Sequence, residues 1–206
     1  MATDTENNSQ NQQTPDPVPN GHWLNAPNSV TIARLGLAIV LFWMIRFEGL
    51  WISAAVVFIV AALTDALDGY LARKYGQVTV LGRILDPFVD KFIICGAFVF
   101  LLEKRLDSGV NSWIVIIVLG REMFVSSLRG ILEKEGRDFS ANMAGKLKMV
   151  LQCAAVTGCL LSLSPDIKSE AFNQARDIVL WLAVAATVWS GLVYVVRAYK
   201  LFTKND

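Results

Sequence analysis

Residues 65–90 read DALDGYLARKYGQVTVLGRILDPFVD, a stretch that sets four aspartates within otherwise membrane-like sequence. They are Asp65, Asp68, Asp86 and Asp90. A carboxylate inside a bilayer costs on the order of 2.5 to 3.5 kcal/mol on insertion scales, unless it has a partner or faces a wet cavity. Four such groups so close together therefore indicate a functional site.

The spacing of these acids predicts a metal site. The first pair lies three residues apart and the second pair four apart, so each pair shares one face of a helix. Two opposed faces of this kind form an all-oxygen site for a hard divalent cation such as Mg2+ or Mn2+. Gly69 and Ala72 keep the first face low, and Arg73 adds a cationic fork suited to phosphate oxygens. Acids that pair with nearby bases, or that form a cation or proton pathway in a transporter, remain alternatives.

The composition predicts an all-α, polytopic membrane protein. The chain has 206 residues, of which 54% are hydrophobic, and the apolar residues come in long runs. Two connections of mixed charge, 103–107 and 165–176, are expected to be solvated loops. The apolar runs predict six transmembrane helices, near 29–47, 50–75, 84–103, 110–131, 143–163 and 177–200.

The chain divides into a tail, a short interfacial segment and one membrane domain. Residues 1–20 are rich in Asn, Gln, Thr and Pro and are expected to be a disordered polar tail without the pattern of a signal peptide. Residues 21–28 contain Trp23 and are expected to lie at the membrane interface before a helix start capped by Asn28 or Ser29. The six-helix domain follows over residues 29–203.

The distribution of basic residues predicts the orientation. With six spans, fourteen of the 19 Lys and Arg residues belong to the side that holds both termini, and five belong to the other side. The positive-inside rule then places both termini and the aspartates at the cytoplasm. The five on the other side are Arg46, Lys104, Arg105, Lys168 and Arg176.

Other chemistries find little support in the sequence. No basic face typical of nucleic-acid binding emerges, and the net charge is +1. Cys95, Cys153 and Cys159 lie in apolar runs without a CxxC motif, so they are interpreted as packing residues. The single histidine, His22, lies in the polar segment before the first helix.

The aspartate motif carries a family resemblance. Its pattern DxxDGxxAR, eight residues and then GxxxDxxxD, with Gly82 opening the second half, resembles the signature of the CDP-alcohol phosphatidyltransferases at every fixed position. The resemblance implies a dimeric six-helix enzyme that displaces CMP from a CDP-linked lipid. It implies that Asp65, Asp68, Asp86 and Asp90 bind metal, that Asp90 also acts as general base, and that Gly69, Arg73 and Thr79 contact the CDP group.

A carboxylate base also has a chemical rationale, because an alcohol does not ionise at neutral pH and must lose its proton as the bond to phosphorus forms. Further segments resemble one branch of the family, the phosphatidylglycerophosphate synthases: residues 27–34, 85–91, 121–129 and 145–148. This implies CDP-diacylglycerol and sn-glycerol 3-phosphate as substrates in a bacterial-type cell membrane. It also implies that Asn28 and Thr31 meet the CDP group.

The acceptor site is predicted from basic residues. Arg121 and Arg129 lie eight residues apart and share a helix face, and Lys146 begins the next helix, where N-terminal NH groups favour anions. Together they predict a pocket for the phosphate of glycerol 3-phosphate. For Lys134, Arg137 and Lys148 we expect snorkelling to lipid headgroups. Inositol phosphate and phosphatidylglycerol remain alternative acceptors.

Overall fold

The computed structural model describes residues 26–75, 80–134, 143–167 and 169–203. Within its helices, residues 26–28, 65–75, 80–84, 86, 133–134 and 202 are described by their backbone alone. The described residues form six long helices and one short helix, without a strand. The helices are α1 (Ala26–Arg46), α2 (Trp51–Tyr75), α3 (Val80–Glu103), α4 (Arg105–Ser108), α5 (Ser112–Lys134), α6 (Met143–Ser162) and α7 (Glu170–Thr203).

The prediction of an all-α fold with six long helices is confirmed, with differences at the connections. The connection predicted at 103–107 contains the one-turn helix α4. Helix α1 begins at Ala26, so Asn28 lies inside its first turn, and Pro27 occupies an early position that helices tolerate. The predicted tail and most of the interfacial segment, residues 1–25, lie outside the described residues.

The prediction of a solvated loop over 165–176 was wrong in its second half. Helix α7 begins at Glu170, an acid in its first turn, where the helix dipole favours negative charge. Arg176 is buried and donates hydrogen bonds to the carbonyl oxygen of Asp107 at 2.5 Å and to Ser162 Oγ at 2.9 Å. The polar segment that begins at Glu170 is therefore the first part of α7. Its Arg176 can be buried there because Asp107 of α4 and Ser162 of α6 supply hydrogen-bond acceptors.

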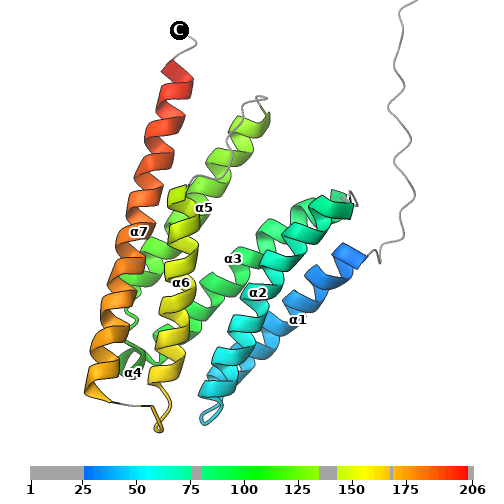
Figure 1. Cartoon of the computed structure of the whole chain (residues 1–206). Helices are drawn as coiled ribbons and strands as arrows, with labels where there is room; N and C mark the ends of the chain where they lie inside the picture. The colour runs from blue at the N-terminus through cyan, green and yellow to red at the C-terminus, as the bar shows by residue number, and fades with distance from the viewer. Residues whose placement is uncertain (1–25, 76–79, 135–142, 168, 204–206) are drawn as a thin grey trace, which may run out of the picture.

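The long helices alternate in direction, so their ends gather at two sides of the bundle (Figure 1). We call the end at which α2 finishes and α3 begins the motif end. Helix α1 begins there and α5 and α7 finish there, whereas the short α4 lies at the opposite end (Figure 1). Helices α1, α2 and α3 pack together, and α6 packs against α2, α3 and α7. Helix α6 thus joins the two halves of the bundle.

Close approach of α1 and α3 depends on a glycine. The ring of Phe42 stacks on Phe100 with centroids 5.0 Å apart and meets Phe92 edge-on at 5.4 Å. A Cβ added to Gly96 would lie 2.1 Å from Phe42 Cζ, well inside van der Waals contact. Gly96 therefore makes the room in which the Phe42 ring packs, and this packing fixes the position of α1 on α3.

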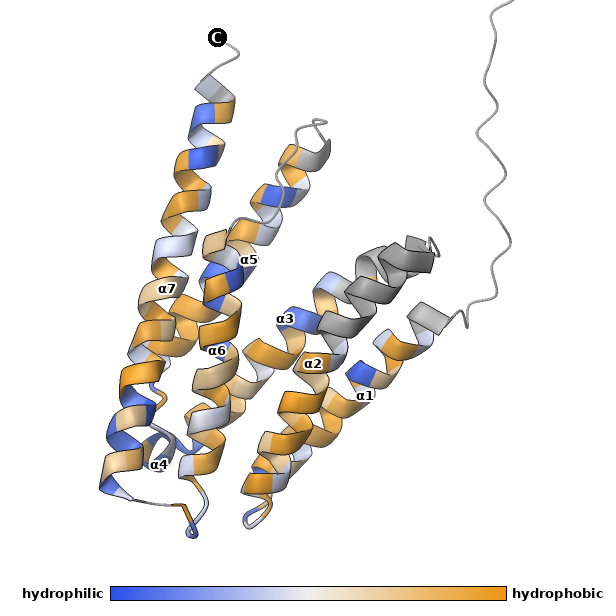
Figure 2. Cartoon of the chain, viewed as in Figure 1, coloured by the Kyte–Doolittle hydropathy of each residue, from blue (hydrophilic) through white to orange (hydrophobic). Residues whose placement is uncertain are grey.

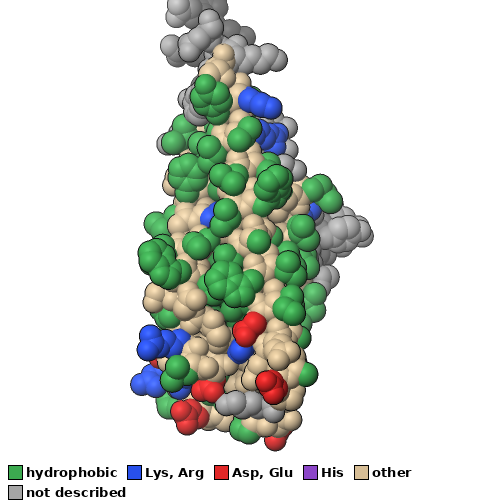
Figure 3. All heavy atoms as spheres, turned by 90° about the vertical axis from the view of Figure 1, so that its left-hand side faces the viewer, with side chains coloured by type: hydrophobic (Ala, Val, Ile, Leu, Met, Phe, Trp, Pro, Cys, Tyr) green, Lys and Arg blue, Asp and Glu red, His purple; other side chains and the backbone are tan. Residues whose placement is uncertain are grey.

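The surface of the bundle is that of an integral membrane protein. Hydrophobic residues predominate in the coloured parts of the long helices (Figure 2), and on the α7 face an apolar belt separates charged residues at the two ends (Figure 3). Three described helical segments are long and apolar enough to cross a bilayer: Ser29–Arg46, Met143–Ser162 and Glu170–Leu201. The apolar part of α2, Trp51–Thr64, is shorter. Six spans therefore remain a prediction.

Candidate active site

The fold brings the two halves of the aspartate motif to one end of the bundle. Asp65 and Asp68 lie in the last turns of α2, just beyond its apolar part, and Asp86 and Asp90 lie in the first half of α3, which contacts α2. Of these four, only Asp90 has a described side chain. The four positions thus lie on two helices that contact each other, and the metal site itself stays a prediction.

The other motif positions follow the same two helices. Gly69, Ala72 and Arg73 occupy the last turns of α2, and Gly82 lies in the first turn of α3. Their side chains, and the whole of Thr79, lie outside what the structure describes. Their predicted contacts with the CDP group therefore stay predictions.

Asp90 forms an ion pair with Arg34 of α1. Arg34 Nη2 donates to Asp90 Oδ1, with the arginine side chain 3% exposed and the aspartate 33% exposed. Both residues line a small pocket, walled also by Phe58, Ala61 and Ala62 of α2, Ile93 and Ile94 of α3, and Met149 and Cys153 of α6. The predicted base is therefore held in place while part of its surface stays open.

Helical spacing links this pocket to the rest of the motif. Asp65 follows Ala61 by four residues and Asp68 follows Asp65 by three, so these positions continue the face of α2 on which Ala61 lies. Because Ala61 lines the pocket with Asp90, Asp65 lies about one helical turn and Asp68 about two turns beyond the pocket along α2.

The contact of Arg34 is not predicted by the sequence patterns described above, which include this residue only within the segment 27–34. The available signal was a permanent charge inside the first apolar run, since such a charge requires a buried partner. Thr31, predicted to meet the CDP group, is 3% exposed and lies one turn earlier on the same face of α1. Asn28 precedes Thr31 by three residues, and its side chain is not described.

A second polar cluster joins α5, α6 and α7. Glu122 of α5 is 6% exposed and accepts a hydrogen bond from Lys148 Nζ of α6. Arg121 Nη1 lies 3.3 and 3.4 Å from the two carboxylate oxygens of Glu122. Arg121 Nη2 donates to Ser190 Oγ of α7 at 2.5 Å. Three helices are thus tied together by one buried carboxylate.

Tyr194 of α7 links this cluster to Arg129. Its ring centroid lies 5.5 Å from the Arg121 guanidinium carbon and 5.9 Å from that of Arg129. Arg129 Nη2 also donates to the Tyr194 hydroxyl at 3.2 Å. The structure therefore brings together two of the three predicted acceptor residues, Arg121 and Arg129, around one buried tyrosine.

The charges of the cluster do not balance. Among the described side chains it holds three cations, Arg121, Arg129 and Lys148, against the single carboxylate of Glu122. The Nε atoms of both arginines are buried without a hydrogen-bond acceptor. Unmatched buried charge is unfavourable, so the cluster suits a ligand that carries about two negative charges and several acceptor oxygens.

The environments of the two lysines of α6 are the reverse of those predicted. Lys148, expected to snorkel, is instead 5% exposed and paired with Glu122, because it continues the inward face of Gln152 and Cys159. Lys146, expected in the phosphate pocket, is exposed. The side chain of Lys134 and the whole of Arg137 lie outside the described residues.

The two polar groups are neighbours across α6. Met149 and Cys153 of α6 line the pocket of Asp90, and Lys148 directly precedes Met149. The pocket of Asp90 and the basic cluster therefore both draw residues from the first turns of α6.

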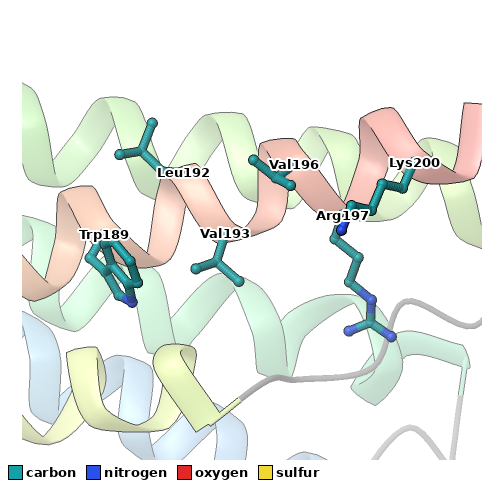
Figure 4. Close-up of a pocket in the computed structure, with 6 residues that line it drawn as sticks. All are labelled: Trp189, Leu192, Val193, Val196, Arg197 and Lys200. Atoms are coloured by element: carbon teal, nitrogen blue, oxygen red, sulfur yellow. The ribbon is translucent and has the colours of Figure 1, made fainter.

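A separate groove runs along α7 (Figure 4). It has a volume of about 430 Å³. Trp189 lies at one end of the groove, and Arg197 and Lys200 lie at the other. The apolar stretch leading to basic side chains is typical of a helix at the boundary between hydrocarbon and headgroups. None of its lining residues is a predicted site residue: Trp189, Leu192, Val193, Val196, Arg197 and Lys200.

Comparison with known proteins places these features in a family. A CDP-diacylglycerol--glycerol-3-phosphate 3-phosphatidyltransferase of Bacillus subtilis (strain 168) is 37% identical over 197 residues, covering 88% of this chain and 95% of the relative. A protein of the same name from Rickettsia bellii (strain RML369-C) is 33% identical, covering 86% of this chain and 97% of the relative.

A third relative has a different name. A cardiolipin synthase (CMP-forming) of Oryza sativa subsp. japonica is 29% identical, covering 88% of this chain and 59% of the relative. Residues 24–189, which include every position of the aspartate motif, match the family described as CDP-alcohol phosphatidyltransferase. The chain therefore belongs to the CDP-alcohol phosphatidyltransferase family.

Proposed function

We propose that this protein transfers a phosphatidyl group from CDP-diacylglycerol to sn-glycerol 3-phosphate, giving phosphatidylglycerol phosphate and CMP. Relatives that carry this activity in their names align over nearly their whole length with this chain. The observation that carries the choice of acceptor is the buried cluster of three cations and one carboxylate beside the pocket of Asp90.

The charge of the cluster favours a phosphate monoester. A monoester carries about −1.5 to −2 charge at neutral pH and offers three acceptor oxygens. This matches the excess of two positive charges among the described side chains around Tyr194. Phosphatidylglycerol has only a phosphodiester with one negative charge, so the cluster fits it less well. Inositol phosphate has the same charge as glycerol phosphate, and the acceptor assay below separates the two.

Asp90 of α3 is the proposed proton acceptor, and Arg34 of α1 holds it in position. In the proposed reaction the glycerol phosphate hydroxyl oxygen bonds to the phosphatidyl phosphorus, the bond from that phosphorus to the CMP oxygen breaks, and the hydroxyl proton passes to Asp90. Arg34 holds the Asp90 carboxylate and orients it for this role. Arg121, Arg129 and Lys148 hold the acceptor phosphate, which raises the effective concentration of the hydroxyl near the reacting phosphorus.

The proposal includes a divalent cation. The donor set of Asp65, Asp68, Asp86 and Asp90 is all oxygen, the chemistry that Mg2+ and Mn2+ prefer. When bound, such a cation would neutralise charge on the diphosphate and on departing CMP. Asn28, Thr31, Gly69, Arg73 and Thr79 are proposed to contact the CDP group, of which Thr31 is buried on α1 and beside Arg34.

We also propose that the motif end faces the cytoplasm of a bacterial-type cell and that the protein forms a homodimer. CMP and glycerol phosphate are water-soluble, so the site must open to the compartment that holds them. The excess of basic residues on that side supports the same orientation. The dimer follows from the family resemblance alone and is tested by cross-linking in native membranes.

The reaction is tested with purified protein in lipid nanodiscs, CDP-diacylglycerol and Mg2+ or Mn2+. CMP release should require glycerol 3-phosphate and should stop when the metal is chelated. CMP release with inositol phosphate or phosphatidylglycerol in place of glycerol 3-phosphate would overturn the acceptor assignment. Ion or proton flux through proteoliposomes without CMP release would instead favour a transporter.

A further inference from the structure

Tyr194 lies at the centre of the basic cluster without belonging to the family signature. Its side chain comes from α7, beyond residues 24–189 that match the family, and it is 2% exposed. Both guanidinium groups lie within 6 Å of its ring centroid, and its hydroxyl accepts a hydrogen bond from Arg129. A single side chain therefore contacts both arginines of α5.

The two arginines are held to different degrees. Arg121 is fixed by Glu122 and Ser190 as well as by the ring of Tyr194. For Arg129 the contacts among described residues are those with Tyr194, namely the ring face and the hydroxyl. Its Nε is buried without an acceptor. Arg129 thus has more donors left for a ligand than Arg121, and Tyr194 sets its orientation.

Room for the tyrosine hydroxyl is made by Gly145 at the start of α6. A Cβ at this position would lie 3.3 Å from the Tyr194 hydroxyl oxygen, closer than most Cβ contacts. A larger residue at position 145 would push the hydroxyl and with it Arg129. The segment 145–148 therefore serves the cluster twice, by leaving space for Tyr194 and by supplying Lys148.

We propose that Tyr194 is a positioning residue that makes the enzyme select an acceptor with a phosphate monoester, by holding Arg129 beside Arg121 in a fixed arrangement. The aromatic ring attracts both cations, which stabilises their positions around Tyr194 in the absence of a ligand. The hydroxyl fixes the fork of Arg129, so that less side-chain freedom is lost when a phosphate binds. This inference rests on the proposed function for its acceptor.

The test uses Tyr194→Phe, which removes only the hydroxyl, and Tyr199→Phe as a matched control. Tyr199 lies on the same helix, is 68% exposed and has no part in the cluster. For Tyr194→Phe the KM for glycerol 3-phosphate should rise about tenfold, while kcat stays within about twofold, because a hydrogen bond to a charged group is lost. Tyr199→Phe should keep both constants. A fall in kcat with unchanged KM, or equal behaviour of the two variants, would overturn the inference.

A second measurement does not depend on turnover. Inorganic phosphate and glycerol 3-phosphate should each raise the thermal unfolding temperature of the wild-type protein, and should raise that of Tyr194→Phe less at equal concentration. If phosphate stabilises the wild type but no CMP is released with glycerol 3-phosphate, the proposed function fails and the anion site stands. If neither ligand stabilises the wild type, or both stabilise the two proteins equally, the role of Tyr194 is refuted.

Discussion

Arg34 of α1 and Asp90 of α3 are 56 residues apart in sequence and form an ion pair inside the bundle. The pair joins the first helix to the aspartate motif at the pocket to which α6 also contributes. In the proposed reaction Asp90 accepts a proton and therefore needs a fixed position. The buried guanidinium of Arg34, from another helix, holds it in that position. The same contact also ties the packing of α1 to the chemistry of the site.

The first prediction concerns the energy of this pair. Arg34→Met should lower the free energy of unfolding by about 1–3 kcal/mol, because Asp90 loses its cation while remaining two-thirds buried. The double variant Arg34→Met with Asp90→Asn should lose less than the sum of the single variants, with a coupling of about 0.5–3 kcal/mol. Unfolding in mixed detergent and denaturant measures all four proteins. Additive losses would show that the pair contributes no energy of its own.

Asp90→Asn should also separate chemistry from binding. The amide cannot accept the hydroxyl proton, so CMP release should fall by about 10²–10⁴-fold, the range for general acid–base groups. Binding of CDP-diacylglycerol, measured by equilibrium retention on nanodiscs, should change little. Asp166→Asn, an exposed position at the opposite end of the bundle, is the control and should keep full activity. An active Asp90→Asn enzyme would remove the base assignment.

Much of the fold could be predicted because membrane helices are long apolar runs, and their approximate bounds follow from hydropathy alone. The errors lie where polar residues are helical. Arg176 lies in a segment of mixed charge that reads as a loop, yet it is buried because Asp107 and Ser162 offer acceptors. Such partners come from distant parts of the chain, so no local pattern reveals them.

The site shows the same limit. The spacing of the aspartates predicts a metal site that stays a prediction, whereas helical periodicity correctly predicted that Arg121 and Arg129 lie together. Whether Lys146 or Lys148 points into the bundle depends on how α6 is rotated about its own axis. That rotation is set by its packing against α2, α3 and α7. Tyr194 could not be selected at all, because an aromatic residue near a helix end is ordinarily interpreted as an interfacial anchor. Its burial between two arginines is a tertiary property.

Gly96 offers a test of the packing of α1 on α3. Gly96→Ala should lower the free energy of unfolding by about 1–3 kcal/mol, the usual cost of overpacking, because the new methyl group would overlap the Phe42 ring. Gly120→Ala is the matched control on α5, where nothing lies within 4 Å of the new methyl group, and alanine there should be neutral or stabilising by up to about 1 kcal/mol. Equal effects of the two substitutions would argue against the close contact at Phe42.

Orientation can be read from single cysteines in a background with Cys95, Cys153 and Cys159 replaced by alanine. Leu106→Cys lies on α4 and is 90% exposed, and Thr203→Cys lies at the end of α7 on the motif side. In spheroplasts, a maleimide that cannot cross membranes should label Leu106→Cys at once and Thr203→Cys only after permeabilisation. The reverse pattern would place the motif end outside the cell and contradict the proposed access of the soluble substrates.

The last prediction concerns Glu122, the single carboxylate among the described side chains of the basic cluster. Glu122→Gln should lower the free energy of unfolding by about 3–5 kcal/mol, since it leaves Lys148 and Arg121 buried without a counter-charge. Lys148→Met in the same protein should restore part of that loss by removing one of the two cations, and Glu103→Gln, an exposed acid at the end of α3, should be close to neutral. Added phosphate should stabilise Glu122→Gln more than it stabilises the wild type, because the site then lacks one more negative charge. Thermal unfolding across a phosphate titration measures this difference, and a smaller phosphate effect in Glu122→Gln would mean that the carboxylate organises the anion site instead of competing with its ligand.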